Sequence, residues 1–196
     1  MRRRVKVLGI MGSSRRDGNT NDLLDVALRG AAEGGAEMEK IVLLDYHVHH
    51  ILNCADCKAE GECPRDDWPI IRDKIFAAEG LIWATPVYWY SVSGLIKVVL
   101  DRLCCTMYWY DTGYFYEKLK GKAAAVLVTL EEQPRFAEHL LGSMKMTINY
   151  DFCKWIDLGH VIAYGGSRGI AIKNEEAVRQ AYELGQRFAR FAEIGG

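Results

Sequence analysis

The sequence lacks long hydrophobic runs, and it lacks an excess of either charge. No apolar stretch approaches the roughly 18 residues that a membrane-spanning helix needs. The 25 basic and 26 acidic residues give a formal net charge of −1, and a balance this close to neutral argues against nucleic acid as the main partner. It also argues against a strongly acidic electron carrier. We therefore expect neither a membrane span nor a nucleic-acid partner.

A secretory leader is not predicted either. Arg2 to Arg4 form a basic start, but Lys6 interrupts the apolar run that follows and Gly12 ends it, so the apolar core of a signal peptide is missing. The expected location is the cytoplasm. There, the six cysteines would be thiols, metal ligands or redox groups rather than structural disulfides.

Several common catalytic and nucleotide-binding motifs are absent. The chain has no H-E-x-x-H motif, so the zinc hydrolases that depend on it are excluded. No lysine lies between Lys6 and Lys40, which excludes a Walker loop. Gly9 and Gly12 are spaced G-x-x-G and do not fit the dinucleotide fingerprint G-x-G-x-x-G. Asp45 lies too far from these glycines to be the ribose-binding acid of that fingerprint.

What the sequence has is a regular alternation of strands and helices. Its 196 residues are 49% hydrophobic and fit one domain, 1–196, with a sizeable core. Five strands alternating with five helices predict an α/β fold, a doubly wound parallel sheet with helices on both faces. The natural strand order is the flavodoxin-like 2-1-3-4-5, which places a ligand at the carboxyl ends of the first and third strands. The predicted strands are 4–10, 37–44, 80–85, 122–130 and 158–164, and the predicted helices are 19–33, 66–78, 93–103, 134–156 and 174–192.

The loop between the first strand and the first helix has the composition of a phosphate cradle. It reads G-S-x-R-x-x-G-N-T over residues 12–20. Backbone N–H groups at a helix N-terminus favour an anion, and glycine lets the backbone approach it closely. Hydroxyl groups and an arginine add further donors. The candidate phosphate-binding residues are Ser13, Arg15, Gly18, Asn19 and Thr20.

The loop after the third strand carries three consecutive aromatic residues. It reads T-P-V-Y-W-Y-S-V-S-G over 85–94, and aromatic faces suit stacking on a planar heterocycle. Pro86 stiffens the turn and removes one donor. The backbone N–H groups from Val87 to Tyr90 are expected to be free to point at a ring carbonyl or nitrogen. The candidate ring-binding residues are Pro86, Val87, Tyr88, Trp89 and Tyr90.

Taken together, the two loops resemble those of the flavodoxin-like, NADPH-dependent FMN reductase family. The second loop matches S/T-P-V-Y-W, followed by S-G-x-x-K and D-R, in the right order after the first loop. By this resemblance, the first loop would hold the FMN phosphate and the second would contact the isoalloxazine. Lys97, Asp101 and Arg102 of the matching segment are interpreted as an ion-paired helix face.

A third segment resembles the iron–sulfur flavoprotein branch of the same family. Cys54, Cys57 and Cys63 are spaced C-x-x-C-x-x-x-G-x-C, but Ile51 stands where that branch has a fourth cysteine. Three interpretations stay open. A [4Fe-4S] cluster could be completed by a remote ligand or solvent, with Cys104, Cys105 and Cys153 as the remaining thiols. Zinc could be bound with a histidine from 47–50. The third interpretation is that the cysteines bind no metal.

The resemblance implies a function and an assembly. The expected function is an oxidoreductase that uses NAD(P)H and bound FMN to reduce a small-molecule acceptor such as a quinone, free flavin, metal ion or azo dye. The alternative is an iron–sulfur flavoprotein or a flavodoxin-like electron carrier. Aromatic clusters at 108–110 and 114–116 are interpreted either as local packing or as a partner surface. Since related flavoproteins are usually dimers or tetramers, a homo-oligomer is expected.

Overall fold

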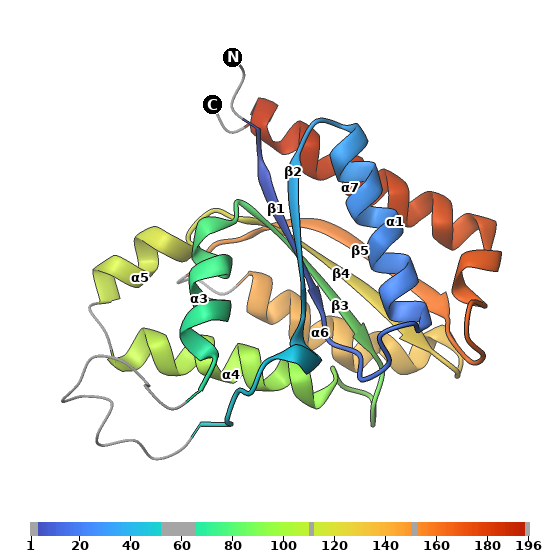
Figure 1. The fold of residues 1–196 in the computed structure, drawn as a ribbon, viewed down its shortest axis with the longest axis horizontal. Coiled ribbons are helices and arrows are strands. Elements are labelled where there is room, and N and C mark those ends of the chain that lie inside the picture. The colour runs from blue at the N-terminus through green and yellow to red at the C-terminus, as the bar shows by residue number, and fades with distance from the viewer. Residues whose placement is uncertain (1–3, 52–65, 110–111, 150–152, 195–196) are drawn as a thin grey trace.

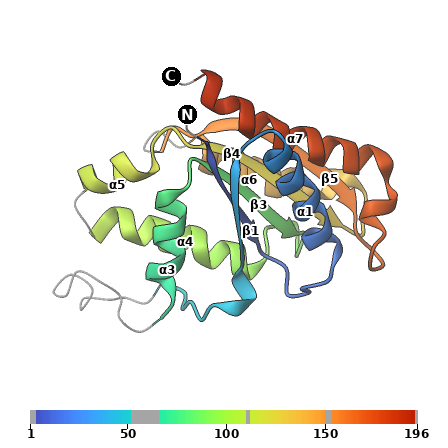
Figure 2. The same cartoon turned by 45° about the horizontal axis from the view of Figure 1, so that its top comes forward.

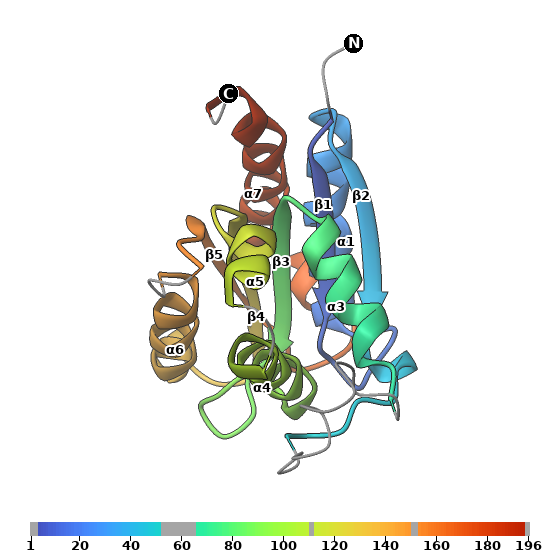
Figure 3. The same ribbon diagram turned by 90° about the vertical axis from the view of Figure 1, so that its left-hand side faces the viewer.

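The computed structural model describes residues 4–51, 66–109, 112–149 and 153–194. Within them, five strands form one parallel sheet in the order β2-β1-β3-β4-β5. This confirms the predicted flavodoxin-like doubly wound sheet. Figure 3 shows the strands side by side in this order. The strands are β1 (Lys6–Met11), β2 (Glu37–Val42), β3 (Gly80–Pro86), β4 (Ala123–Leu130) and β5 (Ile156–Tyr164).

Helices cover both faces of this sheet. The buried residues form two clusters, one beneath α1 and α7 and the other beneath α3, α4, α5 and α6 (Figure 1). The α-helices are α1 (Asn19–Glu33), α3 (Trp68–Ala77), α4 (Gly94–Trp109), α5 (Thr112–Leu119), α6 (Glu138–Ile148) and α7 (Glu175–Ile194). Three short 3₁₀ turns are η1 (Leu43–Asp45), η2 (Pro134–Ala137) and η3 (Ala171–Lys173).

The central strands are apolar along their whole length because both of their faces are covered. Every residue of β4 is buried, as is every residue of β3 except Pro86. The edge strands β2 and β5 mix buried and exposed residues. The continuous apolar run in the sequence therefore marks the middle of the sheet.

Helices α1 and α7 pack closely enough to require glycine at their contact (Figure 2). A Cβ atom at Gly185 of α7 would lie 1.9 Å from the carbonyl oxygen of Ala27 in α1. Because that neighbour is helix backbone, it cannot move aside as a flexible side chain would. This contact fixes α1, and with it the loop that precedes α1.

Three segments differ from the sequence-based prediction, and one of them is α4, which continues to Trp109 instead of ending at residue 103. The segment 134–156 contains η2 and the shorter helix α6, and β5 begins at Ile156. Helix α5 was not predicted, because its aromatic residues resemble a packed loop. Phe115 and Leu119, one helical turn apart, are both buried, and the Phe115 ring packs edge-on against Phe76 with centroids 5.2 Å apart. Local packing therefore accounts for Phe115, while the homo-oligomer stays a prediction.

In the described part of the chain, none of the helices combines the length and the apolar character that crossing a bilayer demands.

Candidate functional site

A cleft of about 750 Å³ opens beyond the carboxyl ends of β1, β3 and β4. Small-molecule sites typically enclose about 300–1,000 Å³. All ten residues predicted from the two loops line this one cleft, although the loops are far apart in the sequence. The lining residues are Ser13, Arg15, Gly18, Asn19, Thr20, Pro86, Val87, Tyr88, Trp89, Tyr90, Thr129, Leu130, Glu131, Glu132, Phe136, Gly165 and Arg168.

One end of the cleft offers donors to an anion. Gly18 is the N-cap of α1 and provides no side-chain cap, so the N–H groups of the first helical turn are left for a ligand. The hydroxyl of Ser13 accepts a hydrogen bond from the N–H of Arg15 at 3.1 Å, which shapes the loop. Among the described residues, the Arg15 side chain has no carboxylate partner. A positive charge and a helix N-terminus therefore meet at this end.

The two loops are tied together beneath the cleft. The N–H of Gly12 donates to the carbonyl oxygen of Ala84 at 2.8 Å, and the hydroxyl of Ser93 donates to the carbonyl oxygen of Gly12 at 2.5 Å. A Cβ atom at Gly12 would lie 2.2 Å from the Ile96 side chain. Glycine at this position therefore allows the first loop to approach β3 and α4 closely.

The Asn19 side chain is already occupied by protein. Its Nδ2 donates to the carbonyl oxygen of Ser167 at 2.8 Å, and its Oδ1 accepts from the N–H of Ala171 at 3.1 Å. Asn19 thus holds the loop after β5 against the start of α1. Its predicted contact with a phosphate stays a prediction, and its backbone N–H is the group placed to make it.

Two threonine hydroxyls meet at the floor of the cleft. The Oγ1 atoms of Thr20 and Thr129 lie 2.6 Å apart and are both buried. One of the two hydroxyls donates to the other. Because each hydroxyl carries one proton, the accepting hydroxyl keeps its own to donate to a ligand.

The aromatic loop forms a tight turn with an unusual backbone. The N–H of Tyr88 donates to the carbonyl oxygen of Ser91 at 3.0 Å, and the reverse bond measures 3.1 Å. Between them, Trp89 and Tyr90 have φ angles of 47° and 61°. Two consecutive positive φ values define a type I′ turn, which usually contains Asn and Gly. Bulky residues in this region are strained, and such strain is concentrated at functional sites.

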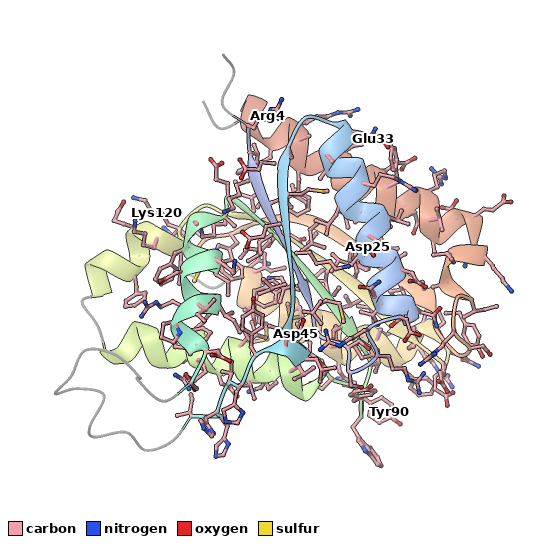
Figure 4. The ribbon with its side chains drawn as sticks, in the orientation of Figure 1. Arg4, Asp25, Glu33, Asp45, Tyr90 and Lys120 are labelled. Atoms are coloured by element: carbon pink, nitrogen blue, oxygen red, sulfur yellow. The ribbon has the colours of Figure 1, made fainter. Side chains whose placement is uncertain are left out.

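This turn corrects the expectation that the N–H groups from Val87 to Tyr90 are free. The N–H of Val87 donates to the carbonyl oxygen of Thr129 at 2.9 Å, and that of Tyr88 closes the turn. Only the N–H groups of Trp89 and Tyr90 are left for a ligand. The Trp89 side chain is 93% exposed, and Figure 4 shows Tyr90 projecting beyond the carboxyl end of the sheet.

Seven residues of the cleft lining are not among the ten residues predicted from the two loops. Phe136 reaches the cleft from η2 and packs against Tyr90, with ring centroids 5.6 Å apart. Arg168 and Gly165 come from the glycine-rich segment after β5, which forms another part of the cleft wall. The available signal was positional, because this segment follows a strand at the same edge of the sheet.

The remaining charges near the first loop are paired. Arg168 forms an ion pair with Asp17 at 2.8 Å, and Arg16 pairs with Asp45. The pairing of Asp45 agrees with its exclusion as a ribose-binding acid. Arg16 lies outside the cleft lining.

The matching segment on α4 is structural, as interpreted. Lys97 pairs with Asp101 at 2.5 Å, one helical turn away. Arg102 is buried and donates to the Asp66 carboxylate at 2.7 Å and to the carbonyl oxygen of His49 at 3.1 Å. These contacts join α4 to the residues on both sides of the cysteine segment.

The predicted metal ligands Cys54, Cys57 and Cys63 lie outside the described residues. Within those residues, no three His, Cys, Asp or Glu side chains gather closely enough to bind a metal ion. Burial raises the pKa of the Cys153 thiol to about 11.

Comparison with known proteins supports the interpretation of the two loops. An iron–sulfur flavoprotein of Archaeoglobus fulgidus is 28% identical over 188 residues, covering 94% of this chain and 79% of the relative. An iron–sulfur flavoprotein of Methanocaldococcus jannaschii is 43% identical over 99 residues, about half of each chain (50% and 51%). The solved structure of a flavone reductase superposes with a TM-score of 0.71 at 25% identity, covering 96% of this chain and 63% of that one.

A sequence profile of the NADPH-dependent FMN reductase family matches residues 5–148. The matched region contains both loops and extends from β1 to the end of α6. Because the match spans well over half of the sequence, the chain belongs to the NADPH-dependent FMN reductase family and is an NAD(P)H-dependent oxidoreductase.

Proposed function

We propose that the cleft binds FMN and that the protein reduces a small organic acceptor, such as a quinone or a free flavin, with NAD(P)H as the electron donor. One observation carries this proposal: residues from both family loops line a single cleft at the topological switch point of the sheet. Family membership supplies the reaction class.

The anion-binding end fits the phosphate of FMN. Arg15 and the first-turn N–H groups of α1 would hold the charged oxygens, because both favour negative charge. The free proton of the Thr20–Thr129 pair would add one hydroxyl donor. Asn19 would act indirectly, by holding the loop after β5 in place.

The aromatic end fits the isoalloxazine ring. Tyr88, Trp89 and Tyr90 would present apolar faces to it, and Phe136 would support Tyr90. The N–H groups of Trp89 and Tyr90 would donate to its polar edge and orient it. Bound FMN would supply the hydride and electron chemistry, and the protein would bind and orient it.

The structural neighbour supports a planar organic acceptor. The flavone reductase is named for a flat, aromatic substrate, and the exposed aromatic turn of this chain suits a molecule of the same shape. A quinone or a flavin has this shape, whereas a saturated acceptor would gain little from the aromatic surface.

The proposal is tested by FMN titration and steady-state turnover. Protein freed of flavin is titrated with FMN while flavin fluorescence is followed, and the loaded protein is then given NADPH or NADH with a quinone. We expect saturable binding and many turnovers per protein. If FMN does not bind, the cleft assignment is wrong. A single stoichiometric reduction without turnover would instead indicate an electron carrier.

A second candidate function is favoured by the names of the relatives. Two curated relatives are iron–sulfur flavoproteins, and the chain carries the C-x-x-C-x-x-x-G-x-C pattern. We propose as the alternative that Cys54, Cys57 and Cys63 help to ligate a cluster or a zinc ion. Iron, sulfide and zinc are quantified in anaerobically purified protein and in Cys57→Ser. Metal present in the wild type and lost in the variant supports this alternative, and metal-free wild type contradicts it.

A further inference from the structure

Two carboxylates line the cleft without a cationic partner in the part of the chain that the structure describes. Glu131 and Glu132 directly follow β4, and both side chains are exposed. Among the described residues, neither forms an ion pair. The lining also contains two arginines. Arg168 is paired with Asp17 at 2.8 Å, and Arg15 lies in the loop at the anion-binding end of the cleft. Neither glutamate is therefore held in a direct ion pair by the described protein.

Along the chain, the two glutamates lie between two contacts with the aromatic loop. The carbonyl oxygen of Thr129 accepts from the N–H of Val87, so the end of β4 lies against the start of the aromatic loop. A few residues later the chain returns to that loop, where Phe136 packs on Tyr90. Glu131 and Glu132 lie between these two contacts.

The nearest arginine along the chain contacts an aromatic ring. The guanidinium carbon of Arg135 lies 5.0 Å from the centroid of the Phe136 ring, in a cation–π arrangement. No ion pair between Arg135 and either glutamate occurs in the described structure. Two negative charges therefore line the same cleft as the aromatic turn.

We propose that Glu131 and Glu132 set the charge selectivity of this oxidoreductase, so that it reduces cationic acceptors faster than anionic ones. This inference rests on the proposed function of the cleft. Uncompensated charges at a cleft raise the local concentration of ions of opposite sign and exclude ions of like sign. The effect weakens as salt rises, because the screening length falls from about 30 Å at 0.01 M to about 8 Å at 0.15 M.

One-electron metal complexes isolate the charge of the acceptor from its shape. One NAD(P)H supplies a hydride, which is two electrons and a proton. Two trications each take one electron and become dications, while NAD(P)⁺ and one H⁺ are released. The same balance holds for two trianions that each become a tetraanion.

The test uses FMN-loaded protein reduced with one equivalent of NADPH. Its reoxidation by hexaammineruthenium(III), by ferricyanide and by neutral benzoquinone is followed by stopped flow at low and high salt. The test variant is Glu131→Gln/Glu132→Gln. The control variant, Glu37→Gln/Glu117→Gln, removes two exposed carboxylates outside the cleft lining. Glu117 pairs with Lys120, which Figure 4 shows on the far side of the molecule from Tyr90.

We expect the ratio of the trication to the trianion rate constant to fall at least about tenfold in the test variant and less than about twofold in the control. In the wild type, the rate constant for the trication should decrease with salt and that for the trianion should increase. An unchanged ratio in the test variant, or an equal change in the control, overturns the inference.

The two proposals fail in different ways. If the wild type binds FMN and is reoxidised by benzoquinone but shows no dependence on acceptor charge, only the charge selectivity is wrong. If FMN does not bind, or no acceptor reoxidises the protein, the proposed function is wrong and the inference fails with it. The salt dependence of the wild type is an independent measurement, should the double variant not fold.

Discussion

The hydroxyl of Ser93 donates to the carbonyl oxygen of Gly12 at 2.5 Å, and this bond joins the two loops that line the cleft. The same hydroxyl accepts from the N–H of Ile96 at 3.3 Å, and the N–H of Ser93 donates to Thr85 Oγ1 at 2.9 Å. Ser93 itself is buried. One small side chain thus couples the anion-binding loop, the aromatic loop and the start of α4.

Replacing Ser93 with alanine should destabilise the protein and loosen the cleft. Leaving buried partners unsatisfied costs about 1–3 kcal/mol, so we expect Ser93→Ala to lower the free energy of unfolding by about that amount. FMN affinity should fall as well, because the two loops lose their link. Urea denaturation and flavin titration measure both effects. Ser143→Ala, at an exposed position on α6, is the control and should change stability by only about a few tenths of a kcal/mol.

Arg15 and Arg16 are neighbours in the sequence with different surroundings. Arg15 lines the cleft, whereas Arg16 pairs with Asp45 outside it. We expect Arg15→Ala to raise the dissociation constant for FMN roughly ten- to hundredfold, as expected for losing a charged hydrogen bond of about 1.5–3 kcal/mol. Arg16→Ala should change it less than about threefold, because an exposed ion pair contributes little.

Riboflavin, which has no phosphate, separates this effect from general damage to the cleft. If Arg15 binds the phosphate, Arg15→Ala should weaken FMN and leave riboflavin binding nearly unchanged. Equal losses for both flavins would contradict the assignment of Arg15 to the phosphate.

The sheet and both loops were predictable because their signals are local. Apolar runs mark β3 and β4, and small or aromatic residues follow β1 and β3 at the edge where parallel strands end. Family resemblance then identified the ten lining residues. The positions of Phe136 and Arg168 were not predictable in this way, because each reaches the cleft only through tertiary packing.

The hydrogen bonding of the aromatic turn was also hidden from the sequence. Whether the N–H groups of Val87 and Tyr88 are free depends on the positive φ angles of Trp89 and Tyr90. The usual signal for such a turn is Asn-Gly, and Trp-Tyr gives no such indication. The turn that departs from the usual Asn-Gly sequence therefore lines the cleft, and strained backbone is concentrated at functional sites.

Relieving this strain should stabilise the protein. Trp89 has a φ of 47° and is 93% exposed. Replacing it can therefore relieve backbone strain while removing few packing contacts. Asparagine tolerates this conformation, and we expect Trp89→Asn to raise the free energy of unfolding by about 1 kcal/mol. Urea denaturation of flavin-free protein measures it. The control is Ser91→Asn in the same turn, where φ is not positive. A loss of stability in Trp89→Asn would contradict the proposal that Trp89 is strained.

Gly185 and Gly142 are both helical glycines, but alanine should affect them in opposite directions. A Cβ at Gly185 would lie 1.9 Å from the carbonyl oxygen of Ala27, so Gly185→Ala must separate α7 from α1. We expect a loss of at least about 2 kcal/mol in the free energy of unfolding. A Cβ at Gly142 of α6 meets nothing within 4 Å. Gly142→Ala should therefore gain about 0.5–1 kcal/mol, the helix propensity difference. Thermal and urea denaturation would show whether the signs differ.

Lys122 gives a prediction about pH. Its ammonium is buried, donates to the carbonyl oxygens of Phe76 (3.0 Å) and Ala78, and has its pKa lowered to about 8 because burial penalises the charge. The ordinary value is 10.5. Between pH 8 and pH 10.5 the unfolded chain therefore holds a proton that the folded chain has lost, so the contribution of Lys122 to stability rises with pH in that window.

The rise should amount to at most about 3.5 kcal/mol, since each pKa unit corresponds to about 1.4 kcal/mol. Lys122→Met removes the titrating group while filling a similar volume. In this variant the carbonyl groups of Phe76 and Ala78 lose their donor. That loss changes the free energy of unfolding by an amount that does not depend on pH. We therefore expect the free energy of unfolding of the wild type, minus that of Lys122→Met, to be flat below pH 8 and to increase toward pH 10.5. Subtraction cancels the titration of groups common to both proteins, including the Cys153 thiol. A difference that stays constant through this window would show that Lys122 keeps its ordinary pKa in the folded protein.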